Sequence, residues 1–258
     1  MSLTQSIVDI EYVQRLARMA GVMAITSQRN LHAELKADGS FVTEADRDIE
    51  QFVRARLAER YPDHEFLGEE FGGSPQTDKP LWAIDPIDGT TNMVTGLPLW
   101  GISLGLTVAG EPVAGVFYMP VTDEMFWGEK GRGSYCNGAP LKTPPPSELH
   151  RESTLGFTST ALKNLDTSEL MGRIRCLGSI AADIAYTARG SLACIVGCQE
   201  GSWDIAATLC IAREAGCNMA YLTGDKVHFP DVMLEGRTRG AFVVAHPQMV
   251  SRMIELLG

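Results

Sequence analysis

The 258-residue sequence lacks the features that would direct it to a membrane or to nucleic acid. It contains no run of about 18 apolar residues, which is the length that a membrane-spanning helix needs. Its first residues do not show a basic segment followed by an apolar one, so no secretory signal is expected. Lysine and arginine form no block, and the formal net charge is −10. The sequence therefore predicts a cytoplasmic protein that binds neither membranes nor nucleic acids.

Closely spaced cysteine pairs are absent as well. The six cysteines form no C-x-x-C motif and stand largely in apolar stretches. This placement favours reduced, mostly buried thiols over a zinc site or disulfides. What the chain does have is length and apolar content, because 45% of its residues are hydrophobic. That is enough for one large domain or two fused lobes around a substantial core.

The spacing of apolar residues divides the chain into helical and β segments. Helical spacing predicts a first helix over residues 3–28, and the capping box at Thr43 and Asp46 predicts a second one that ends near residue 60. Short apolar runs separated by tight turns predict an antiparallel meander over residues 99–127. Further strands are expected at residues 66–68, 153–157, 173–177 and 192–196, and further helices at residues 180–189, at residues 203–216 and after Pro247. This alternation indicates an α/β or α+β layered fold.

Three consecutive prolines at residues 144–146 interrupt this pattern. Consecutive prolines neither continue a helix nor pair in a central strand. We therefore expect an N-terminal α+β lobe over residues 1–143 and a C-terminal α/β lobe over residues 144–258, which together form one compact catalytic unit.

The segment WAIDPIDGTTN carries the most specific chemical signal. An apolar strand is expected to end at Asp85, because a residue before proline avoids the helical region and takes extended geometry. Asp85, Asp88 and the Ile87 carbonyl then converge in a tight turn, where Gly89 permits close approach of the backbone. Carboxylate and carbonyl oxygens suit magnesium, calcium or manganese, and a helix beginning at Thr90 suits a phosphate. Taken alone, the segment fits an ordinary acidic turn equally well.

Three further acidic positions lie at expected element boundaries. Asp46 stands in the first turn of a helix, Glu69 follows a strand, and Asp204 begins a helix. Each has a structural explanation: Asp46 completes the capping box, Asp204 suits a helix N-terminus, and Glu69 with Glu70 suits a solvated loop. Brought together with the two aspartates of the turn, however, these acids would repel one another unless cations neutralised them.

These segments together resemble the inositol monophosphatase family of magnesium-dependent, lithium-sensitive phosphatases. The similar pieces are FVTEAD, GEE, DPIDGTTN and GSWDIAA, which occur in the family's order between about residues 36 and 216. The resemblance implies a five-layer αβαβα sandwich of the sugar-phosphatase type. It also implies metals bound between two lobes and, commonly, a homodimer.

The resemblance implies a set of metal ligands. Glu69, Asp85 and the Ile87 carbonyl would hold one Mg²⁺ ion, and Asp85, Asp88 and Asp204 would hold a second. Glu69 would help to hold a looser third ion, and Mn²⁺ is an alternative metal. Two ions about 3.5–4 Å apart can clamp the attacking and the leaving oxygen of an in-line displacement.

Catalytic roles follow from the same resemblance. Thr90 and Asp46 would orient and deprotonate a water molecule that attacks phosphorus directly, with Glu69 contributing through its metal. The backbone N–H groups of Gly89 and Thr90 would bind the phosphate oxygens. No covalent phosphoenzyme is expected, so the reaction is hydrolysis of a phosphate monoester by an activated water.

Other motifs and functions compete with this interpretation. GISLG at residues 101–105 matches the nucleophile elbow G-x-S-x-G, but it lies inside an expected strand and predicts an interior serine instead. The D-x-x-D spacing of Asp85 and Asp88 is one residue longer than the D-x-D of haloacid-dehalogenase phosphatases. A catalytically silent cation-binding interaction protein is the non-enzymatic alternative, although Asp46 and Thr90 are not needed merely to hold metal.

The sequence predicts the substrate less sharply than the chemistry. A small polyol or sugar phosphate such as inositol 1-phosphate is expected, with histidinol phosphate or a broad range of sugar (bis)phosphates as alternatives. Members specific for inositol carry a glutamate about seven residues before the Trp-Asp pair, where this chain has Gly197. Glu200 could substitute from a shifted loop. Asp183 is a candidate for contacts with sugar hydroxyls, although its pattern favours the alternative of an exposed helical acid.

Overall fold

The computed structural model describes residues 7–28, 32–36, 39–73, 79–145 and 148–258. The expected start of the first helix at residue 3 and the last proline of the 144–146 run lie outside these residues. Within the described part, the elements expected from the sequence are present, with the differences given below. No helix of the described residues is long and apolar enough to cross a membrane.

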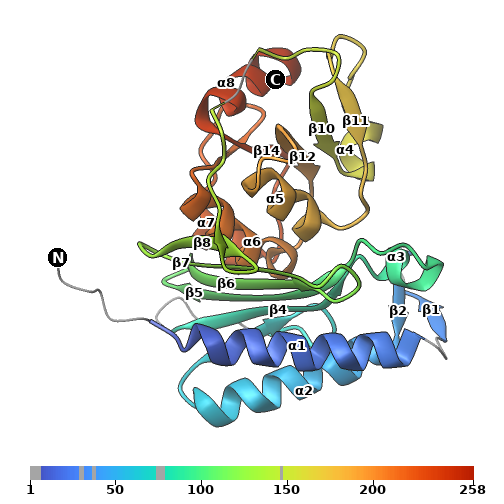
Figure 1. The fold of residues 1–258 in the computed structure, drawn as a ribbon, viewed down its shortest axis with the longest axis vertical. Helices are drawn as coiled ribbons and strands as arrows, with labels where there is room; N and C mark the ends of the chain where they lie inside the picture. The colour runs from blue at the N-terminus through green and yellow to red at the C-terminus, as the bar shows by residue number, and fades with distance from the viewer. Residues whose placement is uncertain (1–6, 29–31, 37–38, 74–78, 146–147) are drawn as a thin grey trace.

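Helices and sheets alternate in five layers (Figure 1). Two long helices cover the outer face of the first sheet, three helices lie between the sheets, and two cover the outer face of the second sheet. The αβαβα sandwich is therefore confirmed. In layer order, the helices are α1 (Ile10–Ser27) and α2 (Glu44–Arg60), then α5 (Ile180–Ala188), α6 (Ser202–Ala215) and α7 (Phe229–Glu235), then α4 (Ser159–Asn164) and α8 (Pro247–Leu257).

The first sheet has seven strands in chain order. The first two strands are parallel, and every later neighbour pair is antiparallel, which confirms the meander. The strands are β3 (Glu65–Gly68), β4 (Leu81–Asp88), β5 (Gly101–Val108), β6 (Glu111–Met119), β7 (Glu124–Glu129), β8 (Gly133–Cys136) and β9 (Ala139–Pro140). The last two were not predicted, because short strands rich in glycine and proline carry no clear alternation.

The second sheet is mixed and follows the order β11-β10-β12-β14-β13. Its strands are β10 (Thr154–Phe157), β11 (Arg173–Arg175), β12 (Cys194–Cys198), β13 (Asn218–Tyr221) and β14 (Ala241–Ala245). Neither β13 and β14 nor the short helices α4 and α7 were predicted. A separate ribbon of β1 (Ala33–Leu35) and β2 (Phe41–Thr43) precedes α2. All six cysteines are free, and four of them are buried, as expected.

The prediction that the apolar strand of the WAIDPIDGTTN segment ends at Asp85 is wrong. Strand β4 continues to Asp88, and its pairing with β5 is interrupted between these two aspartates by a bulge. Pro86, which lacks an N–H donor, falls inside the interruption, where no ladder hydrogen bond is required. The Ile87 N–H instead donates to Asp85 Oδ1 at 2.9 Å. The bulge thus aims the carboxylates at the end of the sheet, and α3 (Thr90–Thr95) begins there as expected.

Helix α6 lies very close to the first sheet. A Cβ atom at Gly115 would stand 2.1 Å from the Ala207 carbonyl oxygen, and one at Gly105 would stand 2.6 Å from the Ala207 nitrogen. Glycine at both strand positions is therefore needed for this approach. Gly105 belongs to the GISLG segment, which lies inside β5 as expected. A helix that belongs to the C-terminal part of the chain is thereby fixed against the N-terminal sheet, with Asp204 in its first turn.

Candidate active site

A cavity of about 290 Å³ opens where the end of β4 meets the N-termini of α3, α5 and α6. Its wall is unusually acidic, because six carboxylates reach it and no lysine or arginine is found in the lining among the described residues. The acidic lining residues are Glu69, Asp85, Asp88, Asp183, Glu200 and Asp204. Such a concentration of like charge requires protons or cations to be stable.

Three of these acids form a tight cluster. One carboxylate oxygen from each of Glu69, Asp85 and Asp204 lies within 4.8 Å of the others. Desolvation raises the pKa of Asp85 well above its usual value, and the nearby charges of Glu69, Asp88 and Asp204 raise it further. Desolvation and the charges of Glu69 and Asp88 do the same to the pKa of Asp204. The explanation of the aspartate turn as an ordinary surface loop is wrong, because all eight residues of β4 are buried.

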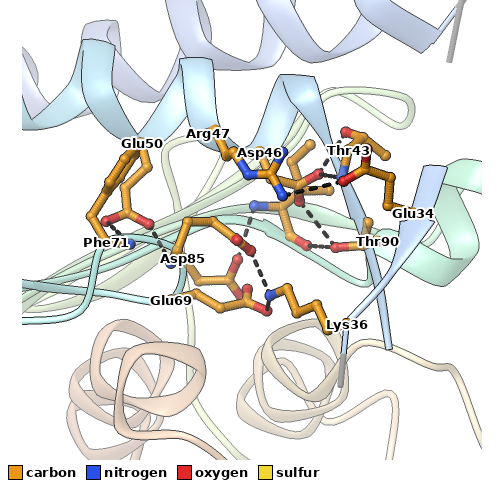
Figure 2. A network of polar contacts seen from close by, with 12 residues as sticks. Glu34, Lys36, Thr43, Asp46, Arg47, Glu50, Glu69, Phe71, Asp85 and Thr90 are labelled. Carbon is orange, nitrogen blue, oxygen red and sulfur yellow. Dashed lines mark hydrogen bonds and ion pairs between the residues drawn. The ribbon is translucent and has the colours of Figure 1, made fainter. Parts of the chain in front are cut away.

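A lysine side chain already neutralises part of this cluster (Figure 2). Lys36 Nζ lies 2.7 Å from Glu69 Oε1 and 2.6 Å from Glu70 Oε1. Burial alone would lower the pKa of Lys36, but its hydrogen bonds to the two glutamates raise it overall. Glu69 and Glu70 therefore do not form the solvated loop that was the alternative. No sequence pattern indicates this contact, because Lys36 and Glu69 are 33 residues apart along the chain.

Asp88 lines the same cavity but is held by residues at the N-terminus of α5. Its Oδ2 accepts a hydrogen bond from the Ala181 N–H at 2.8 Å and another, shorter one from the Ser179 hydroxyl. Desolvation raises the pKa of Asp88 to about 7, against the opposing effect of these two hydrogen bonds. The start of α5 thus fixes one face of an N-terminal carboxylate, so the two parts of the chain complete the site together.

Thr90 lines the cavity, and Asp46 is fully buried outside its described lining, in contact with Thr90 (Figure 2). The Thr90 hydroxyl lies 3.1 Å from Asp46 Oδ1 and 3.0 Å from the Ile87 carbonyl oxygen. Asp46 Oδ2 accepts hydrogen bonds from the Thr43 N–H at 2.8 Å and from the Thr43 hydroxyl at 2.6 Å. Desolvation raises the pKa of Asp46 despite these bonds. Asp46 therefore completes the capping box of α2 and also contacts Thr90, so the structural explanation and the chemical one hold together.

Asp204 likewise combines two contacts. Its Oδ2 accepts the Gly201 N–H at 2.9 Å and so caps α6, while its carboxylate belongs to the acidic cluster.

Gly89 lines the cavity between β4 and α3, with a φ of 93° that favours glycine. A Cβ atom there would stand 3.0 Å from the Leu99 carbonyl oxygen. The backbone of Gly89 and Thr90 therefore lies directly at the cavity surface.

The far wall of the cavity comes from residues in the C-terminal part of the chain. Asp183 lines it with only 1% of its surface exposed, so its alternative reading as an exposed helical acid is wrong. Its Oδ1 has no hydrogen-bond partner among the described residues, and desolvation raises its pKa to about 8. Glu200 also lines the cavity. Gly197 does not belong to the described lining, because it lies within β12 where a Cβ atom would stand 2.5 Å from the Phe242 ring.

One part of this wall was not predicted at all. Residues 158–160, at the start of α4, line the cavity beside Cys176 and Ser179. They reach it because β10 pairs in parallel with β12, which ends just before Glu200. No motif marks residues 158–160, and only the pairing of distant strands brings them to the site.

The donors present fit a hard divalent cation. The cluster offers carboxylate oxygens, and Ile87, whose carbonyl oxygen accepts the Thr90 hydroxyl, belongs to the lining of the same cavity. Oxygen-only sets of this kind suit Mg²⁺, Mn²⁺ or Ca²⁺, whereas zinc and copper prefer nitrogen and sulfur. The ion pair of Lys36 with Glu69 shows in addition that the cluster accepts positive charge.

Comparison with known proteins places this geometry in a family. The family model described as "Inositol monophosphatase family" matches residues 7–253. The chain belongs to the inositol monophosphatase family. Its relatives in this family hydrolyse phosphoric monoesters, and the chain is a phosphatase of that kind.

Individual relatives agree with this assignment. Inositol monophosphatase 3 of Solanum lycopersicum is 37% identical over 200 residues, which cover 72% of this chain and 75% of the relative. A protein named fructose-1,6-bisphosphatase/inositol-1-monophosphatase from Aquifex aeolicus is 29% identical and covers 90% of this chain and 92% of its own length. The structure of a Thermotoga maritima IMPase superimposes with a TM-score of 0.83 at 26% identity, covering 96% of this chain and 95% of that one.

Proposed function

We propose that this phosphatase depends on Mg²⁺ and hydrolyses a small polyol or sugar phosphate such as inositol 1-phosphate. The observation that carries the proposal is the cluster of Glu69, Asp85 and Asp204 oxygens within 4.8 Å, which faces the same cavity as Thr90, whose hydroxyl is bound from behind by the buried Asp46. A catalytically silent cation-binding protein would need the cluster but not the Thr90–Asp46 pair. Mn²⁺ offers similar chemistry, because it also prefers oxygen ligands.

The proposed ligands follow the position of each carboxylate. Glu69, Asp85 and the Ile87 carbonyl would hold one ion. Asp85, Asp88 and Asp204 would hold a second ion. Glu69 would also help to hold a third, more loosely bound ion. When bound, Mg²⁺ would neutralise these acids, lower the pKa of a water molecule and stabilise charge on the phosphate oxygens. Lys36 Nζ contacts Oε1 of Glu69, so the other oxygen of that carboxylate would bind the metal for as long as this ion pair persists.

The chain's own groups would position and deprotonate the attacking water. The Thr90 hydroxyl can donate its proton to Asp46 Oδ1 while its oxygen accepts a proton from the water. The two bonds from Thr43 keep the Asp46 carboxylate in place for that transfer. The backbone N–H groups of Gly89 and Thr90 would hold the phosphate oxygens. Direct attack by water requires no phosphoenzyme.

The leaving alcohol would lie against the second lobe. Asp183 and Glu200 line that wall and are suited to polar alcohols, because each can accept hydrogen bonds from hydroxyl groups. Histidinol phosphate is a second candidate, favoured by the same two acids, which would pair with its ammonium group. Gly197 supplies no carboxylate where inositol-specific members carry one, so the proposed contacts to the alcohol fall on Asp183 and Glu200 instead.

A hydrolysis screen tests both the chemistry and the substrate. Phosphate release would be measured with Mg²⁺ from inositol 1-phosphate, histidinol phosphate, fructose 1,6-bisphosphate and adenosine 3′,5′-bisphosphate, with EDTA and with added Li⁺ as comparisons. The proposal expects Mg²⁺-dependent release, fastest from a polyol or sugar ester. A preference for histidinol phosphate would support the second candidate, and a trapped covalent phosphoprotein would overturn the direct mechanism. Lithium sensitivity, a homodimer, a cytoplasmic location and a lobe boundary between residues 143 and 144 stay predictions.

A further inference from the structure

Helix α2 carries a second buried acid one turn after Asp46. Glu50 has no exposed surface, although glutamate is rarely buried without partners. It does not line the cavity among the described residues. Burying a carboxylate in this way costs free energy unless it is paired and fully hydrogen-bonded, so its contacts show what it serves.

The Glu50 carboxylate binds the chain that follows Glu69 (Figure 2). Its Oε2 accepts the Glu70 N–H at 2.7 Å, and its Oε1 accepts the Phe71 N–H at 3.3 Å. Arg54, four residues later on α2, donates its Nε to Glu50 Oε1 at 2.8 Å. The other end of the Arg54 guanidinium donates to the Gly72 carbonyl oxygen. The Glu50–Arg54 pair therefore hydrogen-bonds to the backbone of three consecutive residues. Because the two side chains carry opposite charges, the pair adds no net charge beside the acidic cluster.

The chain before Glu69 is fitted to the same carboxylate. A Cβ atom at Gly68 would stand 1.9 Å from Glu50 Oε1, so only glycine leaves room for Glu50 there. Gly68 and Gly72 also close a bridge through mutual backbone hydrogen bonds of 3.1 and 3.0 Å. The Glu69 N–H donates to the Ile84 carbonyl oxygen at 3.2 Å, next to Asp85. Glu69 is thus held on both sides.

We propose that Glu50 is a positioning residue, which holds the backbone of Glu70 and Phe71 so that the Glu69 carboxylate faces Asp85 and Asp204. The inference rests on the proposed Mg²⁺ chemistry of that cluster. A carboxylate suits this task because its two oxygens accept bonds from three converging N–H donors, whereas glutamine offers one oxygen and an amide that is itself a donor. Asp46 and Glu50 are one turn apart on α2. This one helix would therefore position both the Asp46 carboxylate that contacts Thr90 and the backbone that follows Glu69.

Substitution Glu50→Gln tests the inference with little change in size. In the metal-free protein, amide hydrogen exchange should accelerate at residues 69–72 and stay unchanged in β5 and β6. Calorimetric titration with Mg²⁺ should show affinity weakened by about tenfold or more, the range found when groups that orient metal ligands are lost. The kcat at saturating Mg²⁺ should be largely retained, because the Thr90–Asp46 pair is untouched.

Two matched variants separate positioning from general damage. Glu59→Gln removes a charge from the same helix, where Glu59 pairs with Arg56 at 3.4 Å and lies exposed. Val53→Ala weakens the buried face of α2 without touching the loop. Both should bind Mg²⁺ like the wild type. Unchanged Mg²⁺ affinity in Glu50→Gln, or an equal loss in Val53→Ala, would overturn the role of Glu50 while leaving the proposed function intact. A wild-type protein that binds no Mg²⁺ would overturn both proposals.

Discussion

Substitution Asp204→Asn should stabilise the metal-free protein while it removes a proposed metal ligand. Asp204 shares the cluster with Glu69 and Asp85, and their oxygens lie within 4.8 Å of one another. Asparagine removes the charge and keeps a side-chain oxygen that can still accept the Gly201 N–H, so the cap of α6 is preserved. The change therefore isolates the repulsion within the cluster.

The expected gain in the free energy of unfolding follows from the distance between these carboxylates. Two unit charges about 4.8 Å apart repel by roughly 3 kcal/mol at an effective dielectric constant of about 20. Lys36 offsets part of the charge on Glu69, and the raised pKa values allow a carboxylate to take up a proton and escape part of the penalty. We therefore expect Asp204→Asn to raise the free energy of unfolding by about 1–3 kcal/mol without metal.

In saturating Mg²⁺, the wild type should become more stable than Asp204→Asn. At about one hundred times its dissociation constant, a ligand stabilises the native state by about 2.7 kcal/mol, and only the wild type should gain this in full. Denaturant unfolding in EDTA and in saturating Mg²⁺ measures both effects, with Asp48→Asn, an exposed acid on α2, as the control. A less stable Asp204→Asn protein in EDTA, or an equal gain from Mg²⁺ in both proteins, would refute the reasoning.

Three further predictions concern the pair, the far wall and the pH response. Asp46→Asn should lower kcat by about 10²–10⁴-fold with unchanged Mg²⁺ affinity in calorimetry, because it loses the proton acceptor for Thr90 but not a proposed metal ligand. Asp183→Asn should raise KM by about tenfold with kcat nearly unchanged in steady-state assays, because its proposed contact is with the leaving alcohol. Without metal, the free energy of unfolding should fall as the pH rises from about 4 to about 8, since burial raises the pKa of Asp88 to about 7 and that of Asp183 to about 8. Urea titrations across this range would measure it.

The pH prediction has a definite sign, and each of the three predictions has an outcome that would contradict it. Acids whose pKa is raised by folding bind protons more tightly in the native state, so their stabilising protons are lost as the pH passes the raised pKa values. Stability that rises over this range in EDTA would contradict the burial of Asp88 and Asp183. Retained kcat in Asp46→Asn would exclude it as the base, and an unchanged KM in Asp183→Asn would remove it from the substrate wall.

The parts of the fold that depend on local pattern were predictable from the sequence. The capping box of α2, the antiparallel meander and the helix beginning beside Asp204 all have short-range signals, and each was found. Strands β13 and β14 and helix α7 were missed because tertiary packing, rather than periodicity, stabilises such short elements. The bulge in β4 was missed for a related reason, since pairing with β5 resumes beyond a proline that would otherwise end the strand.

For the site, residue type was more informative than position. Carboxylates at element boundaries indicated the cluster, and the structure brings Glu69, Asp85 and Asp204 together. The lysine that bridges Glu69 and Glu70 and the serine that binds Asp88 could not be inferred, because both contacts join segments more than thirty residues apart. Gly197 was chosen by counting along the chain and lies outside the described cavity lining, whereas Glu200, the predicted substitute, lies in the cavity wall.

Phosphate release by the wild type and by Asp88→Asn, with Mg²⁺ and with EDTA, tests the central claim most directly. The fastest substrate of the screen would be used, and circular dichroism would confirm that both proteins are folded. The account predicts release by the wild type only with Mg²⁺, and a severe loss in Asp88→Asn. Full activity of the wild type in EDTA, or full activity of Asp88→Asn with Mg²⁺, would contradict it.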